Sequence, residues 1–124
     1  MRKVTGVSLA VALVVGAVIA VVAIASPGMD PVKVAPQAFK EKLNTDKVRV
    51  LEYWSKPGGK EAMHSHPAGI LIVVNAGKFR STAPDGKSTD VEYKGGEVVW
   101  RDALTHSGEN IGTTDLHTYL IELK

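Results

Sequence analysis

The sequence of 124 residues contains no cysteine, and this absence excludes three kinds of chemistry. Disulfides, thiolate metal sites and cysteine nucleophiles all require a side chain that the sequence lacks. An exported location stays compatible with the composition, because oxidising compartments permit disulfides without requiring them.

Aromatic residues are also scarce, at 6% of the chain, so a folded core has to be built from valine, isoleucine, leucine and alanine. The 12 glycines and the many β-branched residues are typical of strands joined by tight turns. The composition therefore favours a β-rich domain.

After residue 25, the chain has no excess of positive or negative charge. The chain has 15 basic and 13 acidic side chains, and two of the basic ones are Arg2 and Lys3. Without the first 25 residues, 13 charges of each sign remain, and lysines alternate with acidic residues. A nucleic-acid partner needs a clustered basic face, so we expect none.

The N-terminal segment is a long run without charge. Arg2 and Lys3 precede an apolar stretch from Val7 to Ala25, about the length that a helix needs to cross a bilayer. The preceding positive charges predict that the following domain lies outside the cytoplasm. We expect residues 1–25 to form a hydrophobic helix that is either a membrane anchor or a signal peptide cleaved after Ala23-Ile24-Ala25, leaving a secreted or periplasmic domain. The length of the stretch favours the anchor.

Residues 26–46 read as a linker, because prolines and glycine interrupt the segment. Within it, a helix is predicted over 36–43, with Pro36 at its first position and Asn44 near its end.

Short alternating segments separated by glycine and proline turns make up residues 47–124. A hairpin turn is predicted at Asn75-Ala76-Gly77. This spacing predicts an all-β antiparallel sandwich or barrel. The predicted strands are Val48–Trp54, Lys60–His66, Ile70–Val74, Lys78–Thr82, Ser88–Tyr93, Glu97–Arg101 and Leu116–Leu123.

His64 and His66 are the residues that point to chemistry. Positions i and i+2 of a strand face the same side, so the two imidazoles are placed to share one metal ion. His106 is available as a third ligand from another strand. Imidazole suits iron, nickel, copper and zinc. Taken alone, such a pair is more typical of two histidines on a solvated strand face than of a metal site.

Glycines around these histidines recur at a known spacing. Gly58, His64, His66 and Gly77 match the pattern G-x5-H-x-H-x3-E-x6-G, except that Ile70 stands at the acidic position. Downstream, a second pattern, G-x5-P-x-G-x2-H-x3-N, is matched in part. Its positions are occupied by Gly95, Arg101 in place of proline, Ala103 in place of glycine, His106 and Asn110.

With these two motifs the sequence resembles the cupin superfamily. The resemblance implies a small double-stranded β-helix, or jelly-roll, barrel over residues 47–124. It also implies a divalent transition metal (iron, nickel, zinc, copper or manganese) held by His64, His66 and His106. Ile70 cannot bind a metal, so the chain looks more like the cupin oxygenases that use three histidines alone, or like a barrel that has lost its metal. Ile70, Ile72 and Val98 are expected to wall the site if they face inward.

Four other polar residues are candidates for a role in the site or in the fold. His117 is expected to be a surface or packed histidine, or a fourth ligand if it faces inward. Arg80 and Arg101 would bind a carboxylate if they pointed inward, but exposure to solvent fits their positions on alternating strands equally well. Asn110 is expected to bond backbone groups in a turn.

These observations leave three classes of function open. The domain is an enzyme with oxygenase or lyase-type chemistry on a small molecule, a non-catalytic module that binds a small molecule or metal, or a metal-free structural barrel. The resemblance also implies that two copies pair as a homodimer.

Overall fold

The computed structural model describes residues 29–124, so the predicted membrane anchor or signal peptide at residues 1–25 lies outside the described residues. Within residues 29–124 no helix is long and apolar enough to cross a membrane. The elements are α1 (Pro31–Val34), β1 (Phe39–Asn44), β2 (Val48–Ser55), β3 (Lys60–His66), β4 (Gly69–Asn75), β5 (Gly77–Thr82), β6 (Ser88–Tyr93), β7 (Val98–Arg101), β8 (Leu104–Asn110) and β9 (Leu116–Leu123).

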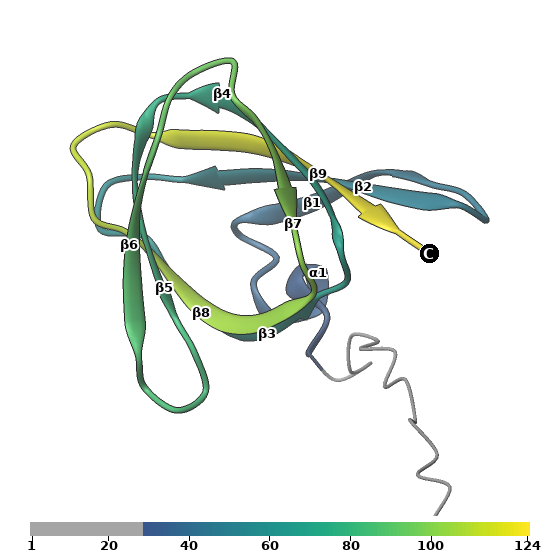
Figure 1. Ribbon diagram of the computed structural model, residues 1–124, viewed down its shortest axis with the longest axis horizontal. Helices are drawn as coiled ribbons and strands as arrows, with labels where there is room; N and C mark the ends of the chain where they lie inside the picture. Colours follow the sequence, from purple (N-terminus) through teal and green to yellow (C-terminus); the bar gives the residue numbers. More distant parts are fainter. Residues whose placement is uncertain (1–28) are drawn as a thin grey trace, which may run out of the picture.

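The strands form two sheets that face each other across an interior (Figure 1). One sheet has five strands in the order β1-β2-β9-β4-β7, and the other has four in the order β3-β8-β5-β6. Neighbouring strands pair antiparallel. The predicted all-β barrel is thereby confirmed.

The helix predicted over 36–43 is wrong. The segment from Phe39 to Asn44 is strand β1 at the edge of the five-stranded sheet, where Phe39 pairs with Tyr53. Pairing with β2 and burial of the Phe39 ring, which is 4% exposed, override the local helical pattern. The short helix lies earlier, at Pro31–Val34, where the Asp30 side chain accepts a hydrogen bond from the Val32 amide at 2.9 Å.

The hairpin predicted at Asn75-Ala76-Gly77 is also wrong. Strand β4 belongs to the five-stranded sheet and β5 to the four-stranded one, so this turn carries the chain across the barrel. Strand β8 was not predicted, because its sequence LTHSGEN has too few apolar residues for a strand pattern. It nevertheless runs through the middle of its sheet, between β3 and β5.

The core lies between the two sheets, because the alternate residues of each strand that face inward meet there. Apolar side chains fill one part of this interior: Ala35, Ala38, Phe39, Leu51, Tyr53, Leu71, Val73, Leu116 and Leu120. Gly69 allows β4 to approach β9 closely, since a Cβ at this position would lie 2.1 Å from the Ile121 carbonyl oxygen.

Candidate metal centre

Strands β3 and β8 bring the three predicted histidines together inside the barrel. His64 and His66 lie on one face of β3, and His106 is the direct cross-strand partner of His64 on β8. One ring nitrogen from each histidine lies within 4.8 Å of the others. All three side chains are buried, at 1–3% exposure, so a solvated strand face is excluded for them.

Each of the three rings uses its Nδ1 atom to contact a polar group of the protein. A ring whose Nδ1–H donates such a bond presents an unprotonated Nε2 on its other side, which is the form that ligates metals. The partners are the Ala62 carbonyl oxygen, 2.7 Å from His64, Glu122 Oε1, 3.0 Å from His66, and Ser81 Oγ, 2.7 Å from His106.

The Nε2 atoms complete the case for a metal. Nε2 of His64 and Nε2 of His106 are buried and have no hydrogen-bond partner among the described residues. Leaving a buried polar atom unpaired costs roughly 1–3 kcal/mol, so such atoms are rare without a reason. Three imidazole nitrogens that converge in this way fit a divalent transition metal.

Burial keeps these rings neutral. Desolvation is the largest cause in each case: it lowers the pKa of His64 and holds the pKa of His66 well below its usual value. The pKa of His106 falls to about 3, because the neighbouring His64 and Arg101 add to the effect of burial. Neutral imidazole is the metal-binding form, so no proton has to be displaced near pH 7.

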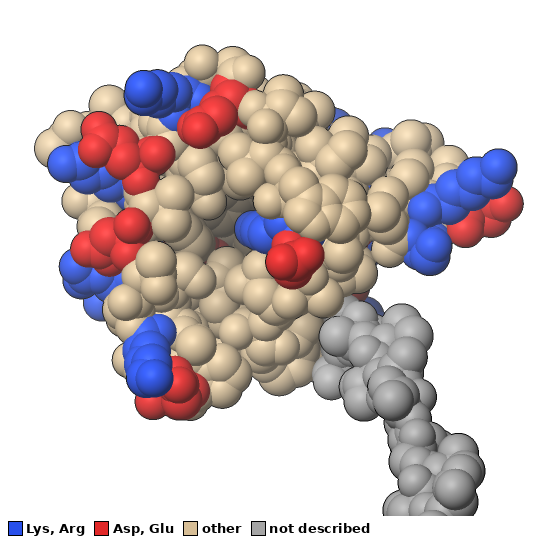
Figure 2. All heavy atoms as spheres, viewed as in Figure 1, with Lys and Arg blue, Asp and Glu red and all other residues tan. Residues whose placement is uncertain are grey.

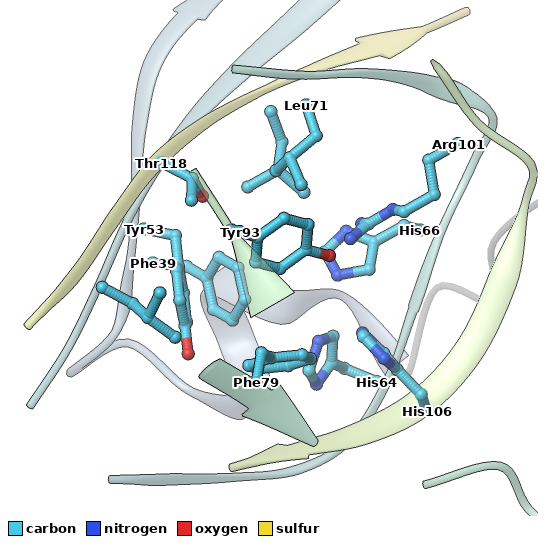
Figure 3. A pocket seen from close by; sticks show the side chains of 12 residues that line it. Phe39, Tyr53, His64, His66, Leu71, Phe79, Tyr93, Arg101, His106 and Thr118 are labelled. Atoms are coloured by element: carbon cyan, nitrogen blue, oxygen red, sulfur yellow. The ribbon is translucent and has the colours of Figure 1, made fainter. Parts of the chain in front are cut away.

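A cavity of about 30 Å³ lies against the three histidines (Figure 3). One water needs roughly 10–15 Å³ on this measure, so the space suits only a small ligand. Its wall is mostly apolar, with Phe39, Leu71, Phe79 and Leu120 among the lining side chains. Figure 2 shows the molecule hollowed near the middle of the face in view, with atoms of a basic side chain beside the hollow.

The expectation that Ile70 stands at the site of a missing acidic ligand is wrong, as is the expected wall of Ile70, Ile72 and Val98. Along β4 the buried residues are Gly69, Leu71 and Val73, and Leu71 is the one that lines the cavity. Ile70 therefore faces the outside of the sheet, and Val98 is 66% exposed. Leu71 also lacks a ligand atom, so the β4 strand contributes no ligand.

Glu122 is a functional candidate that the sequence analysis missed. Its buried carboxylate lies between His66 and Arg49, whose Nη1 is 3.8 Å from Glu122 Oε2. Burial raises the pKa of Glu122 to about 7, against the opposing effect of Arg49. The alternation along β9 could have indicated its position, because Glu122 shares the inner face of this strand with Leu116, Thr118 and Leu120.

His117 is not a fourth ligand. It lies on the outer face of β9, stacked on Trp54 with ring centroids 3.8 Å apart and an interplanar angle of 15°. Its Nε2 lies 3.0 Å from Glu52 Oε1. The expected packed histidine is therefore what the structure shows.

The remaining predicted polar residues divide between surface and site. Arg80 points outward and pairs with Asp90 at 2.7 Å, whereas Arg101 lines the cavity. Asn110 bonds backbone groups of the following turn, as expected.

No protein-family model and no curated protein sequence matches the chain. Solved structures, in contrast, match the chain. A cupin domain from Bordetella pertussis Tohama I is similar at 23% identity and a TM-score of 0.64, over 69% of this chain and 91% of that one.

Two further structures have a TM-score of 0.55 and 20% identity. A protein with a double-stranded β-helix domain from Klebsiella pneumoniae matches 68% of this chain and 70% of its own. An RmlC-like cupin family protein from Methanocaldococcus jannaschii matches 68% of this chain and 77% of its own. At this identity the similarity establishes the fold. Residues 29–124 therefore form a small domain with the double-stranded β-helix fold that these cupin structures have.

Proposed function

We propose that this domain binds one divalent transition-metal ion through Nε2 of His64, His66 and His106. The observation that supports the proposal is the convergence of three buried, neutral imidazoles whose Nδ1 atoms are already engaged. Iron, nickel, zinc, copper and manganese are the candidate ions, because imidazole suits this group of metals.

We further propose an oxygenase or lyase-type reaction on a small molecule at this centre. Three neutral ligands leave the charge of the ion uncompensated, and the bound metal would supply a Lewis acid with open coordination positions. The barrel contributes a mostly apolar wall, which includes Phe39 and Leu71. Tyr93 and Arg101 place polar groups at the same cavity.

Elemental analysis of the full-length protein, purified in detergent without a histidine tag, tests the metal site. We expect one transition-metal ion per chain, and loss of this metal in His64→Ala and in His106→Ala. His117→Ala is the matched control and should keep its metal, because His117 lies on the outer face of the sheet. The ligand set is wrong if both site variants remain folded and keep the wild-type metal load.

A non-catalytic binding module is the second candidate. Among the described residues that line the cavity, none carries a carboxylate. A general base of this kind, which many enzymes use, is therefore missing from the cavity wall. Turnover separates the two candidates: a metal-loaded protein that binds a small molecule but leaves it unchanged, with and without dioxygen, would be the binding module.

The proposed location of the domain is outside the cytoplasm, either anchored by residues 1–25 or released after cleavage. Support comes from the uncharged apolar stretch that follows Arg2 and Lys3. N-terminal sequencing of the mature protein tests this proposal, combined with protease digestion of cells whose outer envelope has been removed and whose cytoplasmic membrane is intact. A full-length chain that is protected from external protease would contradict it.

A further inference from the structure

Arg101 is the one side chain with a full charge at neutral pH among the described residues that line the cavity. The others are apolar, aromatic, hydroxyl or neutral imidazole side chains. Arg101 belongs to the end of β7, and its side chain reaches across the cavity toward His66 (Figure 3).

No carboxylate of the described domain pairs with this guanidinium. The ion pairs of residues 29–124 engage Arg49 and Arg80 but not Arg101. Glu122 interacts with Arg101 only at longer range, since its carboxylate bonds His66 and lies near Arg49. Arg101 is half-buried, and its guanidinium keeps its charge because arginine does not lose its proton in proteins. A charged donor of the cavity wall without a protein partner is open to an anionic ligand.

Tyr93 contributes a second donor to the same space. Its ring enters from the end of β6, and its hydroxyl group points toward Arg101 and His66 (Figure 3). A tyrosine hydroxyl carries its proton at neutral pH and can donate a hydrogen bond. Within the described residues this hydroxyl makes no hydrogen bond to a side chain or backbone group, so it too is available to a ligand.

We propose that the cavity binds a small carboxylate, with its carboxylate group on the Arg101 guanidinium and the Tyr93 hydroxyl and its remaining atoms toward the three histidines. The inference deepens the proposed function by naming the ligand class, and it rests on that function only for the metal. A planar guanidinium matches a carboxylate with two parallel hydrogen bonds. The apolar wall suits the carbon substituent of the ligand, and the cavity volume requires that substituent to be small.

A phosphate ligand is less well matched. It presents more oxygen atoms and more charge than a carboxylate, whereas the wall around Arg101 and Tyr93 is apolar. Unpaired phosphate oxygens against that wall would lose their hydration without replacement.

The test uses acetate as the probe, with acetamide as its neutral counterpart and inorganic phosphate as the competing anion. Binding is measured by NMR titration of the full-length protein in detergent, before and after loading with the metal found by elemental analysis. We expect saturable binding of acetate, with weaker binding of acetamide and phosphate. Arg101→Met should weaken acetate binding roughly 10- to 100-fold, the effect of losing charge-assisted hydrogen bonds. Arg80→Gln, which removes an exposed arginine of the barrel surface, should change it less than about twofold.

The outcomes separate this inference from the proposed function. A protein that holds metal but binds acetate no better than acetamide overturns the carboxylate site and leaves the metal site standing. Acetate binding that depends on Arg101, in a protein that takes up no metal when metal is supplied, supports the carboxylate site and overturns the metal site. Tighter binding of phosphate than of acetate, or equal losses in Arg101→Met and Arg80→Gln, overturns the assignment. The comparison of acetate with acetamide needs no variant, so it decides the question even if Arg101→Met fails to fold.

Discussion

Leu71 and Ile70 are neighbours on β4, and only the Leu71 side chain reaches the cavity. Successive strand residues face opposite sides, so a shift of one position exchanges the interior for the exterior. The absence of a carboxylate ligand thus depends on Leu71, and an acid introduced there would face the histidines.

Leu71→Glu is expected to tighten metal binding about tenfold or more, because an anionic ligand offsets the charge of a divalent ion. The same variant should be less stable without metal, since it buries a carboxylate among apolar groups. Ile70→Glu is the matched control and should leave affinity unchanged. Competition with a chromophoric chelator measures both, and equal effects at the two positions would contradict the assigned orientation of β4.

Ser81 acts on the site through His106. Its Oγ lies 2.7 Å from His106 Nδ1 and holds the ring in one orientation. Ser81→Ala should lower metal affinity roughly 10- to 100-fold, the usual effect of losing a partner of a metal ligand. Ser65→Ala also removes a hydroxyl contact of 2.7 Å, to Thr105, but on the other face of β3. Chelator competition should show little change for Ser65→Ala, and a loss as large as that of Ser81→Ala would mean that both act through stability alone.

Glu52 predicts a pH dependence of stability. Desolvation acts to raise the pKa of Glu52, but hydrogen bonds from His117, Trp54, Lys42 and Tyr119 outweigh it and hold this pKa at about 2, below the usual 4.5. Because the folded-state pKa is depressed, the stabilisation is present above pH 4.5 and is lost as pH falls toward 2. Urea unfolding should therefore show Glu52→Gln less stable than the wild type at pH 7, with the difference shrinking at pH 3. Glu92→Gln, at an exposed position of β6, should follow the wild type at both pH values.

At the scale of elements, Asn110 ties the end of β8 to the strands around it. Its Nδ2 donates to the carbonyl oxygens of Ser55 and Thr114 at 2.8 and 2.9 Å, and its Oδ1 accepts from the Gly112 amide at 3.0 Å. The side chain is fully buried. This one residue therefore connects β2, β8 and the turn that leads into β9.

Asn110→Ala is expected to lower the free energy of unfolding by about 2–4 kcal/mol, because it leaves buried backbone groups without partners. Glu109→Ala is the control, since the carboxylate of Glu109 makes only a 3.8 Å pair with Lys60 at the surface. Its effect should stay within about 0.5 kcal/mol. Urea unfolding compares the two, and a loss below about 1 kcal/mol for Asn110→Ala would show that water replaces its hydrogen bonds.

At the scale of the whole molecule, the proposed metal joins the strands β3 and β8 of one sheet, and a ligand on Arg101 would extend the connection to β7 of the other. Binding to the folded state alone adds about 2.7 kcal/mol of stability when free metal is a hundred times its Kd. In a domain of this size this corresponds to a rise in Tm of roughly 10–20 °C.

Calorimetry with the ion found by elemental analysis checks this expectation. The wild-type protein should gain that rise in Tm. A variant in which His64, His66 and His106 are all alanine should gain none, because the ion then has no folded-state site. An equal rise in both proteins would place the metal elsewhere. The pairing of two copies that the resemblance implies stays a prediction for sedimentation analysis.

The sequence by itself determined the all-β class, most strand positions and the meeting of two histidines on one strand face. These features are local: alternation shows that His64 and His66 share a side, and glycines and prolines mark where strands end. The resemblance then extended this reading to the cupin fold and to His106.

Only the tertiary structure decided which face of each strand is inside. A period of two does not distinguish Ile70 from Leu71, and it does not reveal that β1 pairs with β2 or that polar β8 lies in the middle of its sheet. The partners of the histidine rings and the inward course of Arg101 depend on strands distant in the sequence. Long-range pairing and burial decide these contacts, and neither is contained in any local run of residues.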